Sequence, residues 1–138
     1  MRATTSIIEM KHILVVDDEE PICELFSGFF RRRGYQVSTA GTAEEALAVL
    51  KLKAVDLVLL DLGLPDLDGL DLLTILKIDY PDLPVVMMTG QIIDREFLRE
   101  LAQRRGAGYV NKPVNLNLLL QEIKWTISAC QIPAFAPV

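Results

Sequence analysis

Short apolar runs that stop at polar residues recur along this chain. Runs of this kind, bounded by turn signals, are typical of strands that a parallel sheet buries on both faces. They occur at residues 13–16, 57–60 and 85–88, and a shorter one occurs at 109–110. The run at 57–60 belongs to the stretch 55–61, which ends in Asp61. Residues 35–39 instead alternate between apolar and polar, as a half-buried edge strand does. The pattern therefore predicts five strands.

Segments with apolar residues at helical spacing follow each strand. The expected helices begin near Pro21, Thr42, Asp68, Asp94 and Asn115. Thr42 opens a capping-box pattern, and the side chains of Asp68 and Asn115 suit the cap position. Gly28 costs the first helix about 1 kcal/mol relative to alanine, so a close packing contact is expected to explain it.

The alternation of strands and helices predicts the class of the fold. It is typical of an α/β domain with a doubly wound parallel sheet and helices on both faces. We expect this single domain to cover residues 11–129, preceded by an arm at 1–10 and followed by a tail at 130–138.

Composition narrows the choice of partners. The chain has 138 residues, of which 51% are hydrophobic, and its net charge is −5. An acidic chain lacks the basic face that general nucleic-acid binding needs, and no apolar run is long enough to cross a bilayer. Cys23 and Cys130 lie within apolar patterns and are interpreted as reduced thiols, with a disulfide as the alternative. We expect a cytoplasmic protein without direct contacts to nucleic acid or membrane.

Polar residues at the strand ends indicate the chemistry. Right-handed crossovers bring these ends to one edge of the sheet, which collects Asp17, Asp18, Asp61, Thr89 and Lys112. Crowded carboxylates favour a bound cation, and a few oxygen ligands suit Mg²⁺ shared with a phosphate. A hydroxyl and an ammonium group suit an anion, and an aspartate can attack phosphorus. The pattern therefore indicates phosphoryl transfer.

Four motifs at this edge carry a resemblance to a known family. They are Val15-Val16-Asp17-Asp18-Glu19, Asp61-Leu62-Gly63-Leu64-Pro65-Asp66-Leu67-Asp68-Gly69, Met88-Thr89-Gly90 and Tyr109-Val110-Asn111-Lys112-Pro113. With them the chain resembles the receiver domain of bacterial two-component response regulators over about residues 11–129. The resemblance implies a (βα)5 fold with strand order 2-1-3-4-5. It also implies a signalling switch, not an enzyme, that promotes only its own phosphorylation and dephosphorylation.

The resemblance implies a role for each residue of the site. Asp61 would accept a phosphoryl group from a phosphohistidine on a sensor histidine kinase or a histidine phosphotransfer protein. Asp18 would bind Mg²⁺ directly and Asp17 partly through water, with Asp61 and the backbone carbonyl of Gly63 as further ligands. Lys112 would contact the phosphoryl oxygens.

The resemblance also implies how the signal leaves the domain. Thr89 and Tyr109 would form a switch pair, in which Thr89 turns toward the phosphoryl group and Tyr109 swings inward. The surface of the fourth helix, fifth strand and fifth helix would change for a downstream protein, an effector domain or a second copy of the chain. The bond between Lys112 and Pro113 would be cis, as the family pattern has it.

Two departures from the family pattern stand out. The segment Gly106-Ala107-Gly108-Tyr109 is one residue shorter than usual, which predicts a tighter loop before the fifth strand. Gly63 and Gly90 leave two positions beside the phosphoryl group without side chains. We expect easier access of water there, and a shorter-lived phosphoryl state.

Plainer interpretations stay open beside these expectations. The three aspartates can be solvated loop acids, Thr89 a helix cap, Lys112 a surface lysine and Tyr109 a core aromatic. His12, at a strand start, is interpreted as structural. At the level of the whole protein, the rivals are a flavodoxin-like cofactor binder and a receiver-like scaffold that takes no phosphate. The chain is read either as a stand-alone receiver or as a fragment of a longer regulator.

Overall fold

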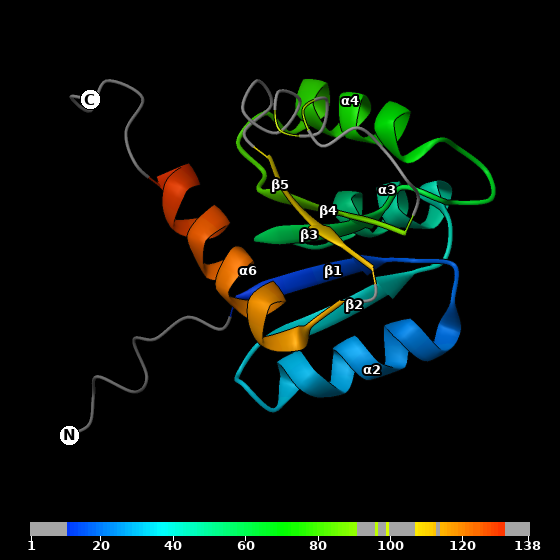
Figure 1. Cartoon of the computed structure of the whole chain (residues 1–138). Helices are drawn as coiled ribbons and strands as arrows, with labels where there is room; N and C mark the ends of the chain where they lie inside the picture. The colour runs from blue at the N-terminus through cyan, green and yellow to red at the C-terminus, as the bar shows by residue number, and fades with distance from the viewer. Residues whose placement is uncertain (1–10, 91–95, 97–98, 100–106, 113, 132–138) are drawn as a thin grey trace.

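The computed structural model describes residues 11–90, 96, 99, 107–112 and 114–131, and Figure 1 shows the chain. The arm at 1–10, most of the tail and most of the helix expected at 94–105 therefore lie outside the described residues, although Glu96 and Arg99 are described and are helical. Gly106, Pro113 and the side chain of Cys130 lie outside them too. The proposed cis bond and the tight loop before the fifth strand thus stay predictions.

Strands and helices alternate through the described residues. The strands are β1 (His12–Val16), β2 (Gln36–Ala40), β3 (Leu57–Asp61), β4 (Val85–Thr89) and β5 (Ala107–Asn111). The helices are α2 (Glu20–Arg31), α3 (Ala43–Leu52), α4 (Gly69–Asp79) and α6 (Leu116–Gln131). The strands form one parallel sheet in the order β2-β1-β3-β4-β5, which confirms the predicted fold class and strand order.

Helices cover both faces of the sheet, as Figure 1 shows. Successive side chains of a strand point to opposite faces, so the buried residues divide into two cores. One core joins the sheet to α3 and α4, and the other joins it to α2 and α6. Strands β1, β3 and β4 are buried along their whole length, which explains their continuous apolar runs.

Side-chain caps fix the start of three helices, as the sequence predicts. Thr42 accepts a hydrogen bond from the backbone N–H of Glu45, Asp68 accepts one from Leu70, and Asn115 accepts from Asn117 and Leu118. In the predicted capping box, the carboxylate of Glu45 bonds to the N–H of Gly41 instead of that of Thr42. The cap therefore reaches one residue further back than the usual pattern.

The fifth strand is longer than the sequence pattern predicts. It runs from Ala107, because each of its five residues pairs with a residue of β4. Gly108, which the sequence pattern places before the apolar run at 109–110, lies inside this strand. A β-carbon at Gly108 would lie 2.9 Å from Glu122 Oε2 and 3.0 Å from Thr126 Oγ1, both on α6. Glycine thus lets α6 pack closely on β5.

The prediction of a close packing contact at Gly28 is wrong. A β-carbon at this position would meet only Arg32 Nη2, at 3.8 Å, which is ordinary van der Waals contact. None of the residues that the structure describes requires glycine there.

Two residues outside the site behave as the sequence indicates. His12 is buried; its Nδ1 donates to the carbonyl of Ala54 (3.1 Å), so its Nε2 accepts from Ser38 Oγ (2.7 Å) in the neutral ring. Cys23 is a buried free thiol whose Sγ donates to the carbonyl of Asp17. Burial raises the pKa of Cys23, which is unfavourable for a catalytic thiolate. None of the described helices combines the length and the apolar character that a membrane span requires.

Candidate functional site

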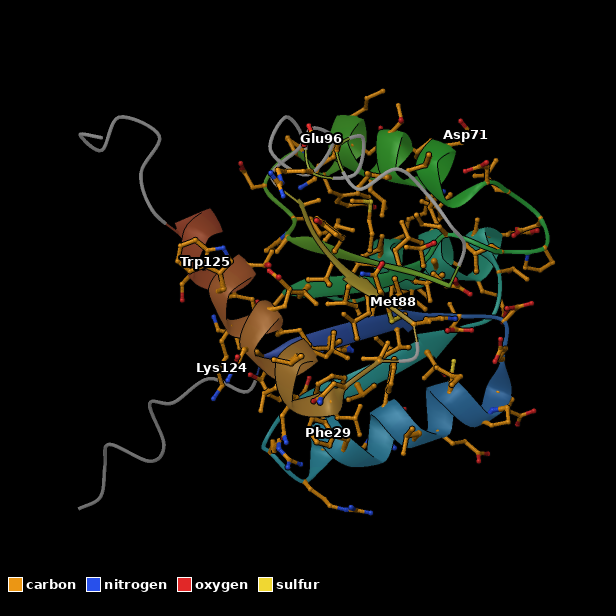
Figure 2. All side chains as sticks on the ribbon, in the orientation of Figure 1. Phe29, Asp71, Met88, Glu96, Lys124 and Trp125 are labelled. Atoms are coloured by element: carbon orange, nitrogen blue, oxygen red, sulfur yellow. The ribbon has the colours of Figure 1, made fainter. Side chains whose placement is uncertain are left out.

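The register of the sheet brings the polar strand ends level with one another. Val16 pairs with Leu60, and Asp61 pairs with Met88. Asp17 follows Val16 directly, so it lies beside Asp61 on neighbouring strands. Met88, the residue of β4 that pairs with Asp61, is labelled in Figure 2. Lys112 follows β5 and extends back across β4 toward both acids.

Lys112 joins the two aspartates. Its Nζ lies 3.1 Å from Asp17 Oδ2 and 3.4 Å from Asp61 Oδ2. Asp17 and Asp61 are 1% and 6% exposed, so both carboxylates are almost out of contact with bulk water. A single ammonium group therefore faces two buried carboxylates. The interpretation of Asp17 and Asp61 as solvated loop acids is wrong, whereas Asp18 is exposed.

The pKa of Asp17 is raised above its ordinary value. Burial is the largest cause, because it disfavours the charged carboxylate, and the charge of Asp61 acts in the same direction. Hydrogen bonds from the backbone N–H of Glu19 (2.9 Å) and from Lys112 oppose the shift without cancelling it. The ionised form of Asp17 is thus only partly compensated by the protein itself.

The pKa of Lys112 is also raised. Burial, the largest single influence, lowers it, but the hydrogen bond and charge of Asp17 and the charge of Asp61 together outweigh burial. Lys112 therefore stays positively charged, which leaves the pocket with more negative than positive groups. The raised pKa of Asp17 and the raised pKa of Lys112 are consistent with each other, because one ammonium group is shared between two carboxylates.

The backbone around Asp61 fixes the orientation of its carboxylate. Oδ1 accepts the N–H of Gly63 at 3.1 Å, and this leaves Oδ2 directed at Lys112. The N–H of Leu62 donates to the carbonyl of Met88, so the chain stays attached to β4 as it leaves β3. A β-carbon at Gly69 would lie 2.4 Å from Leu62 Cα, so only glycine lets α4 begin this close to the site.

A cluster of acids completes the site. Carboxylate oxygens of Asp17, Asp18 and Glu19 lie within 4.8 Å of one another, with Asp18 and Glu19 exposed. Asp61 does not belong to this group of three acids, and Lys112 lies between its carboxylate and that of Asp17. Glu19 was not among the predicted ligands; its signal was the run of acids that follows the first strand.

This donor set fits Mg²⁺. Oxygen ligands from carboxylates suit a hard cation, and a divalent charge would offset the ionised form of Asp17 that burial disfavours. Gly63, the other predicted ligand, follows Asp61 closely and donates its backbone N–H to the Asp61 carboxylate.

Thr89 and Tyr109 lie on the same face of the sheet. Thr89 ends β4, is 2% exposed and pairs with Asn111. Tyr109 pairs with Met87 and packs, half-buried, against the core that faces α3 and α4. Tyr109 is thus a core aromatic in this structure, and its movement with Thr89 stays a prediction.

Comparison with known proteins identifies the family. Residues 13–124 match the model of the response regulator receiver domain. The chain belongs to this family. The result agrees with the four motifs and sets aside the flavodoxin-like cofactor binder. It follows that the domain serves phosphorylation-dependent signalling in two-component systems.

Relatives and solved structures agree with the assignment. The alkaline phosphatase synthesis transcriptional regulatory protein PhoP of Bacillus subtilis is 37% identical over 125 residues, which are 90% of this chain and 51% of PhoP. The chain thus spans about half the length of such curated relatives. A CheY-like receiver domain protein from Methanospirillum hungatei has a TM-score of 0.80 at 33% identity, covering 89% of this chain and 98% of the other. TrrA from Thermotoga maritima, solved in complex with Mg(2+)-BeF, has a TM-score of 0.74 at 32% identity, covering 85% and 99%.

Proposed function

We propose that Asp61 is the phosphoacceptor of this receiver domain. The observation that carries the proposal is the position of its carboxylate: at a strand end, 6% exposed, and 3.4 Å from the ammonium group of Lys112. The phosphodonor is a phosphohistidine on a sensor histidine kinase or a histidine phosphotransfer protein. We place this exchange in the cytoplasm.

Transfer requires one bond to form and one to break. A carboxylate oxygen of Asp61 attacks the phosphorus, the P–N bond to the donor histidine breaks, and the imidazole leaves with the electron pair and takes up a proton. Lys112 turns from the carboxylates to the phosphoryl oxygens, where its positive charge stabilises the added negative charge. The bond from Gly63 N–H holds the Asp61 side chain in place for this attack.

We propose that Mg²⁺ assists this step. Asp17, Asp18, Asp61 and the carbonyl of Gly63 would hold it. When bound, it neutralises charge on the transferring phosphoryl group. Glu19 lies close enough to Asp17 and Asp18 to take part in the ligand sphere. That TrrA was solved with Mg(2+)-BeF supports the proposal by similarity.

The output is proposed to pass through the surface of the fourth helix, β5 and α6, of which the fourth helix, expected at 94–105, is described only at Glu96 and Arg99. Thr89 would turn toward the phosphoryl group, and Tyr109 would move inward from its half-buried position on the same face. Leu118 and Trp125 on α6 are 60% and 67% exposed, and Figure 2 shows Trp125 on the outer side of this helix. The partner that binds this surface would be a downstream protein, an effector domain or a second copy of the chain. Direct contact with nucleic acid or membrane forms no part of the proposal.

Intact mass measurement tests the phosphoacceptor. The full chain is incubated with acetyl phosphate and Mg²⁺, and the wild type is expected to gain the mass of one phosphoryl group. Asp61→Asn should gain none, because an amide oxygen is too weak a nucleophile. Asp71→Asn is the matched control, since Asp71 is exposed on α4 and Figure 2 shows it on the outside of the molecule. Phosphorylation of Asp61→Asn, or none in the wild type, contradicts the proposal.

A further inference from the structure

The loop from Leu62 to Asp68 joins β3 to α4 and carries a proposed metal ligand, the carbonyl of Gly63. The loop has no regular secondary structure. Its first residue is attached to β4 through the bond from Leu62 N–H to Met88. Its last residue, Asp68, caps α4. A backbone bond from Gly69 N–H to the carbonyl of Leu62 also joins the two ends of the loop, and side-chain contacts hold the residues between them.

Asp66 connects the middle of this loop to another helix. Its Oδ1 accepts the backbone N–H of Ala43 at 2.9 Å, and its Oδ2 accepts that of Glu44 at 3.2 Å. Both donors lie in the first turn of α3, more than twenty positions earlier in the chain. The two carboxylate oxygens thus fork onto two successive N–H groups of a helix that belongs to a different β-α unit.

Helix α3 therefore has two caps of different origin. Thr42 supplies the local cap and takes the N–H of Glu45. Asp66 supplies a distant cap and takes the two N–H groups before it. The bond from Ala43 is the main reason that the pKa of Asp66 is lowered, and Asp66 is accordingly ionised at neutral pH. Thr42 and Asp66 stabilise the same helix end, but only Asp66 also belongs to the loop with Gly63.

We propose that Asp66 is a positioning residue that holds the Gly63 loop against α3 and so keeps the Mg²⁺ site assembled. Pro65 fixes one backbone dihedral next to Asp66, which shortens the flexible part of the connection between the two positions. Leu64 and Leu67 pack, half-buried, against the core beneath α3 and α4, so the loop is pressed onto the same surface. The inference rests on the proposed function, because it assumes that Mg²⁺ binds here.

The connection has a consequence at α3. If the Asp66 bonds favour the loop arrangement that binds Mg²⁺, then bound Mg²⁺ must in turn favour the Asp66 bonds, because coupling free energies are reciprocal. The backbone amides of Ala43 and Glu44 should therefore sense the metal, although neither residue is a proposed ligand.

The test is a Mg²⁺ titration of the full chain, followed by calorimetry and by the amide NMR signals of Ala43 and Glu44. In the wild type these two signals should shift with the same midpoint as the heat of binding. Asp66→Ala should weaken Mg²⁺ binding about tenfold, the lower end for loss of an outer-shell contact. Asp66→Asn keeps one acceptor oxygen, so its affinity for Mg²⁺ should lie between that of the wild type and that of Asp66→Ala.

Thr42→Ala is the matched control. It removes the other cap of the same helix and costs about 1 kcal/mol of stability, but it leaves the loop untouched. We expect it to bind Mg²⁺ as the wild type does. Binding by Asp66→Ala as tight as that of the wild type, or equal weakening by Thr42→Ala, overturns the inference. Absence of Mg²⁺ binding in the wild type would instead count against the proposed metal site.

Discussion

Asp17 is the residue at which function and stability conflict. It is 1% exposed, and burial raises its pKa more than the bonds from Glu19 and Lys112 lower it. At neutral pH the carboxylate is ionised in the unfolded chain, so the folded state carries the cost of a buried charge. A site that waits for a divalent cation must tolerate this cost while the cation is away.

Asp17→Asn is therefore expected to raise the free energy of unfolding in the absence of Mg²⁺. The amide oxygen can still accept the N–H of Glu19, and Lys112 keeps Asp61 as a partner. The gain should be full above the raised pKa of Asp17 and should shrink as the pH falls through it, because the wild-type carboxyl then becomes neutral. Urea unfolding at several pH values measures both effects. An equal or lower stability of the variant at neutral pH would contradict this account.

Gly63 is expected to set the lifetime of the phosphoryl group. A β-carbon there would lie 3.8 Å from Asp61 Oδ1, so any side chain would lie beside the reacting carboxylate. Gly63→Asn should slow dephosphorylation several-fold, because the new side chain hinders the approach of water to phosphorus. Intact mass, followed over time after removal of acetyl phosphate, gives the rate. Gly28→Ala serves as the control glycine far from the site, and an unchanged rate in Gly63→Asn would sink the expectation.

At the scale of the helix, α2 contains an avoidable weakness. Gly28 lies within α2 without a positive φ, and the described part of the chain leaves room for a methyl group there. Gly28→Ala should therefore raise the free energy of unfolding by about 0.5–1 kcal/mol, through the lower entropy of the unfolded chain. Chemical denaturation detects a change of this size. A loss of stability would mean that the methyl group disturbs the packing of α2 on β2.

At the same scale, Gly69 and Gly108 are required by close packing between elements, which the sequence pattern alone does not reveal. Gly69 lets the start of α4 lie close to the backbone of Leu62, and Gly108 lets Glu122 of α6 lie close to β5. From the sequence, Gly108 was interpreted as a break before a two-residue strand, because glycine weakens strands in isolation. Pairing along the whole of β4 overrides this preference. The local signals that succeeded were those with a local cause: the caps at Thr42, Asp68 and Asn115.

For the whole molecule, the residue pattern predicted the fold class and the meeting of Asp17, Asp61 and Lys112, whereas the strand order came from the resemblance to the receiver family. It could do so because period-2 and period-3.6 patterns and the right-handed crossover rule determine which strand ends meet. The bonds from the N–H groups of Ala43 and Glu44 to Asp66 could not be predicted, since they join the first turn of a helix to a loop, at a distance that only the folded chain defines. The sharing of Lys112 between two carboxylates was missed for the same reason.

Mg²⁺ is expected to stabilise the whole domain, since a ligand that binds only the folded state raises its free energy of unfolding. At a concentration one hundred times the dissociation constant the gain is about 2.7 kcal/mol. For a domain of this size that corresponds to a rise in the thermal midpoint of about 10 °C. Differential scanning calorimetry of the full chain, with and without Mg²⁺, measures the shift.

The size of this shift also reports on the ligands. Asp18→Asn should lose most of it, because Asp18 is a proposed ligand that is exposed, and its replacement leaves the buried pair of Asp17 and Lys112 in place. Asp71→Asn, outside the site on α4, should keep all of it. A shift of the same size in Asp18→Asn and in the wild type would mean that Mg²⁺ stabilises the domain from somewhere other than the carboxyl ends of β1 and β3.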